Sequence, residues 1–147
     1  MTLLRRDCVM DYGLLGSVMS LVLTDDFYSK QPVFSQRNAI YYAVKHGKCL
    51  VHTVDNDVVG FATYGFFTDE ELRNDSWDGD EAYARGVGGV LFFPKFQCRA
   101  GRREVIKFIR NIQSFMFENY PNVEIGGGLR VYPDGSTRSE KWHRKVA

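Results

Sequence analysis

The fold is decided by residues 84–132, which read ARGVGGVLFFPKFQCRAGRREVIKFIRNIQSFMFENYPNVEIGGGLRVY. Between residues 101 and 120 apolar residues recur at spacings of three and four, which predicts a long helix with one buried face. The flanking runs, 84–96 and 123–132, are rich in β-branched, aromatic and glycine residues and are predicted to be strands. Two strands joined by a long helix are expected to lie parallel in one sheet, with a right-handed crossover.

Two helices and a hairpin are predicted ahead of this segment. Apolar spacing predicts helices over 9–24 and 34–46. The runs at 49–54 and 58–67, joined by an Asp-Asn-Asp turn, have the pattern of an antiparallel hairpin. An acidic segment at 69–81 is expected to form a short helical turn and an exposed loop.

The C-terminal tail, 133–147, opens with a Pro-Asp-Gly turn and is expected to end in a short helix. The complete order is helix, helix, strand, strand, strand, helix, strand. This order predicts one α/β (α+β) domain over 1–147, in which helices flank a mixed, mostly antiparallel sheet.

Composition excludes several classes of protein. The chain has 147 residues, 16.9 kDa, a net charge of +1 and 14% aromatic residues, which excludes a disordered chain. No apolar run approaches the length of a membrane-spanning helix, and no secretory signal is visible. The cysteines, Cys8, Cys49 and Cys98, are widely spaced and are predicted to be free thiols in a reducing cytoplasm, with no metal site.

Charge is unevenly distributed along the chain. Residues 1–94 hold 8 Lys/Arg and 13 Asp/Glu, whereas residues 95–147 hold 11 Lys/Arg and 5 Asp/Glu. A basic C-terminal part favours an anionic partner, such as an acidic or phosphate-bearing carrier. Two solvated faces of opposite sign would produce the same pattern. Nucleic-acid binding through the basic tail is a weaker alternative.

The order of elements resembles the GNAT acyltransferase fold. Within that fold, residues 16–133 resemble the toxin-activating lysine acyltransferases, which transfer fatty acyl groups from an acyl carrier protein to internal lysines of RTX toxins. The stretches that carry the resemblance are 16–33, 49–71, 90–96 and 129–133. The resemblance implies a GNAT-like domain that uses acyl-CoA or acyl carrier protein as its acyl donor.

The sequence departs from that family at its catalytic positions. The family uses a His in the loop after its first helix and an Asp on its central strand, because a His held by a carboxylate is a suitable base for a lysine amine. The matching positions here are Tyr28 and a site near Gly89 or Val90. Besides Tyr28, the replacement candidates are His52 and Tyr64, for which a solvated strand face and aromatic packing are the respective alternatives.

The start of the helix at 101 is the predicted cofactor site. GNAT enzymes bind the cofactor pyrophosphate on backbone N–H groups through a Q/R-x-x-G-x-G/A pattern, and the junction here, QCRAGRR, matches it in part. A helix N-terminus favours an anion, and arginine forms bidentate bonds to phosphate. A solvated basic corner is the alternative. The central strand is expected to supply an oxyanion-binding N–H. The residues expected to contact the cofactor are Phe92, Phe93, Gln97, Arg99, Gly101, Arg102 and Arg103.

Three functions follow from these observations. The first is transfer of an acyl or acetyl group from acyl-CoA or acyl carrier protein to an amine. The second is a catalytically inactive GNAT-fold component of a larger assembly, such as a phage virion or host-takeover protein, with a protein partner that holds the chain ends. The third is nucleic-acid binding. We prefer the first function.

Overall fold

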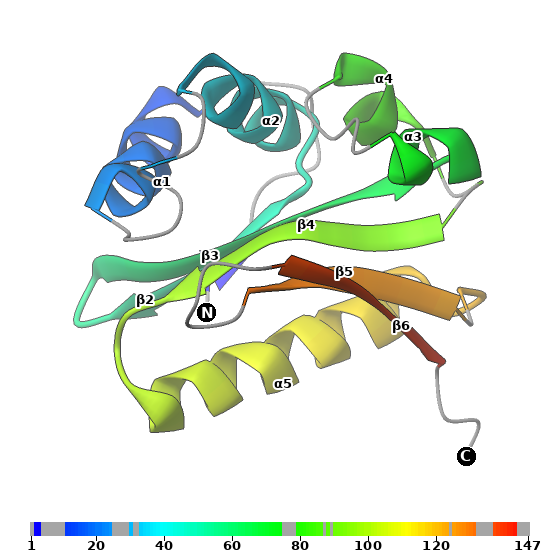
Figure 1. Cartoon of the computed structure of the whole chain (residues 1–147). Coiled ribbons are helices and arrows are strands. Elements are labelled where there is room, and N and C mark those ends of the chain that lie inside the picture. The colour runs from blue at the N-terminus through cyan, green and yellow to red at the C-terminus, as the bar shows by residue number, and fades with distance from the viewer. Residues whose placement is uncertain are drawn as a thin grey trace.

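A computed structural model of the chain shows a single mixed sheet with helices on both faces (Figure 1). The parts of the chain that the structure describes are residues 2–3, 11–24, 30, 33–74, 79–86, 88, 90–123, 125–131 and 137–143.

The sheet has six strands, and each strand lies beside the one that follows it in sequence. Every neighbouring pair is antiparallel except β4 and β5, which run parallel because α5 crosses between them. The strands are β1 (Thr2–Leu3), β2 (Cys49–Val54), β3 (Asp57–Phe67), β4 (Val90–Cys98), β5 (Ile125–Val131) and β6 (Thr137–His143).

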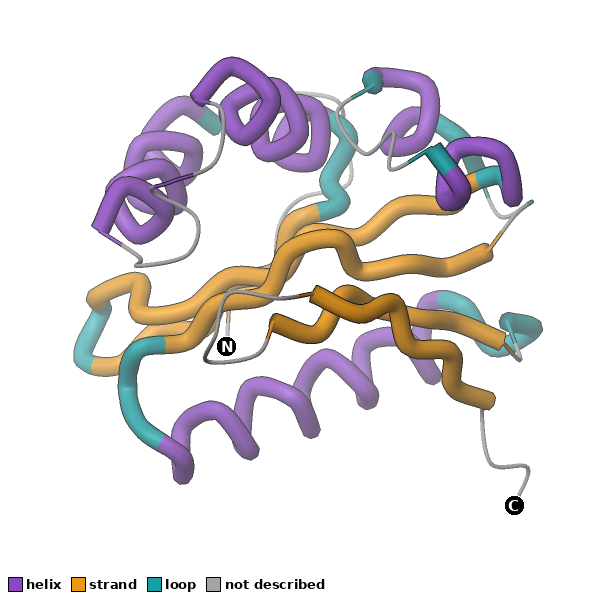
Figure 2. The backbone as a smooth tube through the Cα atoms, viewed as in Figure 1, coloured by secondary structure: helices purple, strands orange, loops and turns teal. Residues whose placement is uncertain are grey.

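The helices divide between the two faces of the sheet, as Figure 2 shows. Among the helices of the described residues, the longest, α5, covers one face, and the other four lie over the opposite face. Their bounds are α1 (Tyr12–Thr24), α2 (Val33–Lys45), α3 (Asp69–Arg73), α4 (Asp80–Ala84) and α5 (Arg102–Asn119).

The predicted strand–helix–strand unit and the hairpin are confirmed. In the hairpin turn, Asp55 and Asn56 adopt φ angles of 50° and 68°, which short polar side chains tolerate. Gly47 ends α2 with a φ of 69°, the left-handed conformation expected of a glycine after a helix.

Two parts of the chain differ markedly from prediction, and strand β1 was not predicted. The central strand begins at Val90 rather than at residue 84, because residues 80–84 form helix α4. The tail contains strand β6 rather than a terminal helix. Strand β6 pairs with β5 along its whole length. This pairing satisfies the backbone of an edge that would otherwise be open, so tertiary contact overrides the local tendency of the tail.

Side chains from the sheet build a separate core on each face. One core joins α1, α2 and α4 to residues such as Phe61, Phe67 and Phe92. The other joins α5 to residues such as Tyr64 and Phe66. The second core places α5 across β2, β3 and β4, and so determines where the first turn of α5 lies.

A capping box formed by Thr68 and Glu71 stabilises the start of helix α3. The Glu71 carboxylate also accepts a hydrogen bond from Arg85. Burial raises the pKa of Glu71, but hydrogen bonds from Arg85 and Thr68 outweigh burial, and the pKa is lowered overall. The stabilisation is therefore present above the pKa of an unfolded glutamate and is lost as pH falls through the lower folded pKa.

We therefore expect Glu71→Gln to reduce the free energy of unfolding by roughly 1 kcal/mol at neutral pH. The difference from the wild type should vanish in acid, where the wild-type carboxylate is itself protonated. Urea denaturation at the two pH values measures both quantities. An equal loss of unfolding free energy at both pH values would show that the charge of Glu71 does not contribute to the stabilisation.

Candidate functional site

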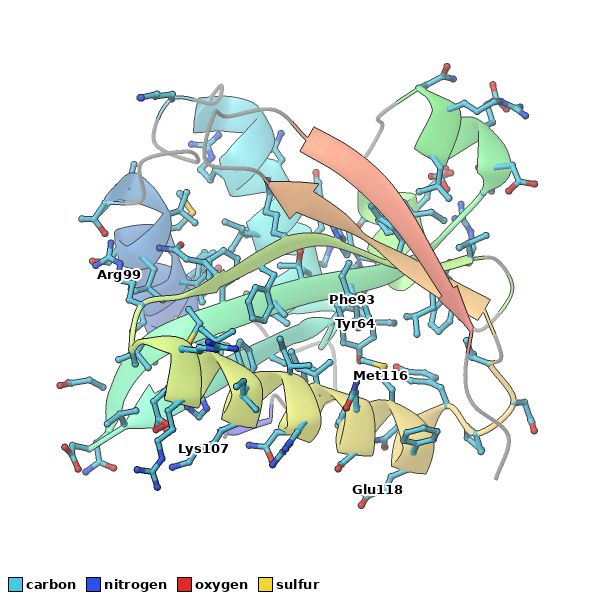
Figure 3. All side chains as sticks on the ribbon, turned by 60° about the horizontal axis from the view of Figure 1, so that its bottom comes forward. Tyr64, Phe93, Arg99, Lys107, Met116 and Glu118 are labelled. Atoms are coloured by element: carbon cyan, nitrogen blue, oxygen red, sulfur yellow. The ribbon has the colours of Figure 1, made fainter. Side chains whose placement is uncertain are left out.

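The two parallel strands at the centre of the sheet stay in register over only part of their length. Residues 91–93 of β4 lie opposite residues 126–128 of β5. Strand β4 continues to Cys98 and β5 to Val131, and Figure 3 shows them diverging beyond the paired part. An extended ligand can lie along a strand edge where the neighbouring strand turns away. The divergence therefore marks the edge of β4 as a candidate binding surface.

A bulge in β4 lies where this divergence begins. Thr63 is opposite Lys95 and Gly65 is opposite Phe92, so two residues of β4, Phe93 and Pro94, face the single residue between them on β3. Bulges bend a strand and redirect its side chains, and they are frequent beside active sites. Pro94 has no N–H to donate, which further interrupts regular pairing at this point.

Residues 99–101 connect strand β4 to the first turn of α5. Gly101 precedes the helix with φ 85° and ψ 170°, a conformation that is essentially restricted to glycine. No side-chain hydrogen bond caps the helix, and Arg102 and Arg103 are exposed at its first two positions. The first N–H groups of a helix lack partners within it and carry partial positive charge. An anion at this position would meet backbone donors and two guanidinium groups.

The other two residues of the predicted phosphate pattern have an internal partner. The Gln97 amide and the Arg99 guanidinium each donate a hydrogen bond of 3.2 Å to the backbone carbonyl of Leu21, near the end of α1. Arg99 also donates its backbone N–H to Val59 of β3. These contacts attach α1 to the end of β4. Gln97 is buried, whereas Arg99 is exposed.

Phe92 and Phe93 point to opposite faces of the sheet. Phe92 is buried on the α1 side, with its ring 5.9 Å from that of Phe67. Phe93 packs on the α5 side, with its ring 5.7 Å from that of Tyr64. Both residues lie in the section of β4 that is paired with β5. The amides expected to bind an oxyanion therefore lie within the parallel ladder.

Tyr64 sits opposite the bulge, under α5. Its side chain is packed against aromatic rings, and the residue is 1% exposed. Its hydroxyl lies 3.0 Å from the hydroxyl of Tyr120, at the end of α5. Figure 3 shows Tyr64 and Phe93 together between the sheet and the helix, with Met116 beside them.

His52 is buried, not on a solvated strand face. It projects from β2 towards α5, is 4% exposed, and its ring stacks on Phe108 at 5.4 Å. Glu104, at the third position of α5, lies 3.7 Å from its Nε2 atom. The side chain points inward because the alternation of β2 and the covering helix place it in the α5 core. Burial argues against direct contact between this imidazole and a substrate amine.

Two residues of this region, Glu104 and Tyr120, were not predicted from the sequence to belong to a site. An acid three residues after an uncapped glycine was a signal for Glu104. The aromatic residue at the end of the apolar stripe was a signal for Tyr120. Tyr28, the third predicted catalytic residue, lies outside the described residues.

No three His, Cys, Asp or Glu side chains gather as a metal site in the part of the chain that the structure describes. Cys49 and Cys98 are free thiols, and burial raises the pKa of Cys49 to about 12. None of the described helices has the length and apolar character needed to cross a bilayer.

Comparison with known proteins identifies the fold. The sequence matches no family model and no curated protein. The loading GNATL domain of CurA from Lyngbya majuscula superposes with a TM-score of 0.57 at 12% identity, over 90% of this chain and 67% of that domain. The polyamine N-acetyltransferase of Drosophila melanogaster also gives a TM-score of 0.57, at 10% identity, over 89% of this chain and 76% of the enzyme. The protein therefore shares the GNAT-like fold of these two structures.

Proposed function

We propose that this protein transfers an acyl group from a thioester carrier, acyl-CoA or acyl carrier protein, to an amine. The observation that carries the proposal is that β4 leaves β5 and is followed, after residues 99–101, by an uncapped helix start with two exposed arginines. This arrangement offers an extended strand edge and an anion site at its end. A phosphopantetheine arm has the matching form, an extended chain with a phosphate at one end.

The residues at the start of α5 fit such a carrier. Gly101 contributes no side chain beside the first turn, and nothing lies within 4 Å of where its Cβ would be. The N–H groups of the first turn and the guanidinium groups of Arg102 and Arg103 would bind the phosphate. In this proposal Gln97 and Arg99 support the site by attaching α1 to β4. The carrier supplies an activated carbonyl, which an amine attacks directly.

The first test is binding. Isothermal titration with acetyl-CoA, CoA and an acyl-loaded carrier protein should show saturable binding of at least one, and release of free thiol should follow when polyamines or lysine peptides are added. Absence of binding to all three at millimolar concentration would reject the proposal. Binding without thiol release would support the inactive GNAT-fold component instead.

Within this proposal, Tyr64 acts on the leaving thiolate through Tyr120. Tyr64 is 1% exposed, so its hydroxyl positions that of the half-buried Tyr120, which donates the proton. The position of Tyr64 opposite the bulge and the paired hydroxyl groups support the role. We expect Tyr64→Phe to lower kcat by about 10- to 100-fold with little change in the Kd for CoA. Tyr120→Phe is the matched variant, since it removes the other hydroxyl. A purely structural pair would change the melting temperature in both variants and leave kcat unaffected.

A further inference from the structure

His52 and Glu104 form a pair beneath the first turn of α5 that the proposed reaction leaves unused. Their closest atoms, Nε2 and Oε2, are 3.7 Å apart, which is beyond hydrogen-bond distance. Neither ring nitrogen of His52 has a hydrogen-bond partner in the described structure, and its side chain is 5% exposed. Buried polar atoms without partners are uncommon and costly, so this pair needs an explanation.

The orientation of the Glu104 side chain is informative because another glutamate of this chain, at the same position of its helix, is oriented differently. Glu71 is the third residue of α3, and its carboxylate turns back to accept the backbone N–H of Thr68, the residue that caps that helix, at 2.8 Å. Glu104 holds the same position in α5, after Gly101. Its carboxylate instead points inward, towards His52. By this comparison, the backbone N–H of Gly101, just before α5, is not occupied by the acid of its own helix.

We propose that His52 is a positioning residue for the anion site, which it serves by holding the Glu104 carboxylate under α5. The inference rests on the proposed function, because it concerns the same site. Protonated His52 attracts the carboxylate, and loss of the proton weakens that attraction. Glu104 can then turn back to the start of its own helix, as Glu71 does, and compete with a bound anion. Anion binding should therefore weaken as pH rises.

The groups that face the imidazole come from α5 and from the sheet. From α5, Lys107 places its Nζ 3.5 Å from Glu104 Oε2, and Phe108 covers the ring. From the sheet, Gly60 lies opposite His52, and the Cys98 thiol lies beside Gly60. Lysine keeps its charge across the neutral range and a thiol ordinarily stays mostly protonated below pH 8, whereas imidazole ordinarily changes its charge within that range.

The experiment is a titration with sulfate, whose charge is constant between pH 5.5 and 8. Binding is followed through the backbone amide signals of Arg102, Arg103 and Glu104. For the wild type we expect the Kd to be about two- to tenfold larger at pH 8 than at pH 5.5, as befits one charge near a helix start. In Glu104→Gln the Kd should stay low at both values. In His52→Gln it should not vary with pH.

Matched controls separate this role from general effects. His46→Gln removes a histidine that pairs with Asp80, over the opposite face of the sheet, and Glu118→Gln removes an acid from the other end of α5. Both should keep the wild-type pH dependence. The double variant of His52→Gln with Glu104→Gln should match Glu104→Gln alone, because His52 acts only through Glu104.

Each outcome decides between the two proposals. If sulfate, CoA, acetyl-CoA and the acyl-loaded carrier protein all fail to bind at any pH, the anion site itself is absent and the proposed function fails. If sulfate binds and the pH dependence survives in His52→Gln or in Glu104→Gln, the positioning role is overturned while the anion site stands. Glu104→Gln alters a partly exposed side chain, so it keeps the test valid even if His52→Gln does not fold.

Discussion

Changing Arg102 and Arg103 together to glutamine is expected to weaken CoA binding by about 100-fold. A hydrogen bond to a charged group contributes about 1.5–3 kcal/mol, and each 1.4 kcal/mol corresponds to about a factor of ten in Kd. Both guanidinium groups are exposed in the first turn of α5, beside N–H groups that no side chain caps. Losing both removes the charge and the bidentate donors, while the backbone N–H groups remain. Isothermal titration measures the change.

The matched control for this variant is the pair Arg73→Gln and Arg110→Gln. It removes the same number of positive charges from exposed positions outside the first turn of α5. We expect less than about threefold weakening, because exposed charges at a distance are largely screened at physiological salt. Equal weakening by both pairs would mean that net charge, and not a built anion site, attracts the ligand. That result would remove the observation on which the transferase proposal depends.

The parts of the fold that are set by local patterns could be predicted from the sequence. The helix periodicity of α5 and the turn residues Asp55 and Asn56 act over a few residues, and both predictions are confirmed. Strand β6 could not be predicted in this way, because it forms by pairing with the edge of β5. The start of β4 was misplaced because nothing local separates α4 from the glycines that follow it.

In the candidate site, too, the features set by local sequence could be predicted, and those set by tertiary contacts could not. The uncapped glycine and the arginines at the start of α5 are visible in the sequence, because capping is a local property. The partners of Gln97 and Arg99 are not, since both donate to Leu21, which is distant in sequence. His52 is the clearest case. Its burial depends on α5 crossing β2, a contact that the pattern of β2 alone does not contain.

Replacing Phe108 by alanine is expected to destabilise the protein by about 3–5 kcal/mol. Phe108 is fully buried between the sheet and α5. Its ring lies 5.4 Å from that of His52 on β2 and 5.3 Å from that of Phe96 on β4, and both pairs are stacked. The truncation therefore opens a cavity that two strands and a helix share. Thermal and urea denaturation measure the loss.

Phe117→Ala is the matched control, because it makes the same chemical change on the same helix at a residue that is 51% exposed. We expect it to cost about 1 kcal/mol or less. At a temperature where Phe108→Ala is still folded, its CoA binding should also be weaker, since Phe108 fixes the helix turn that follows Arg102 and Arg103. Wild-type binding in a destabilised but folded Phe108→Ala protein would show that the first turn of α5 holds its position without this packing. The anion site would then depend on the junction at Gly101 alone.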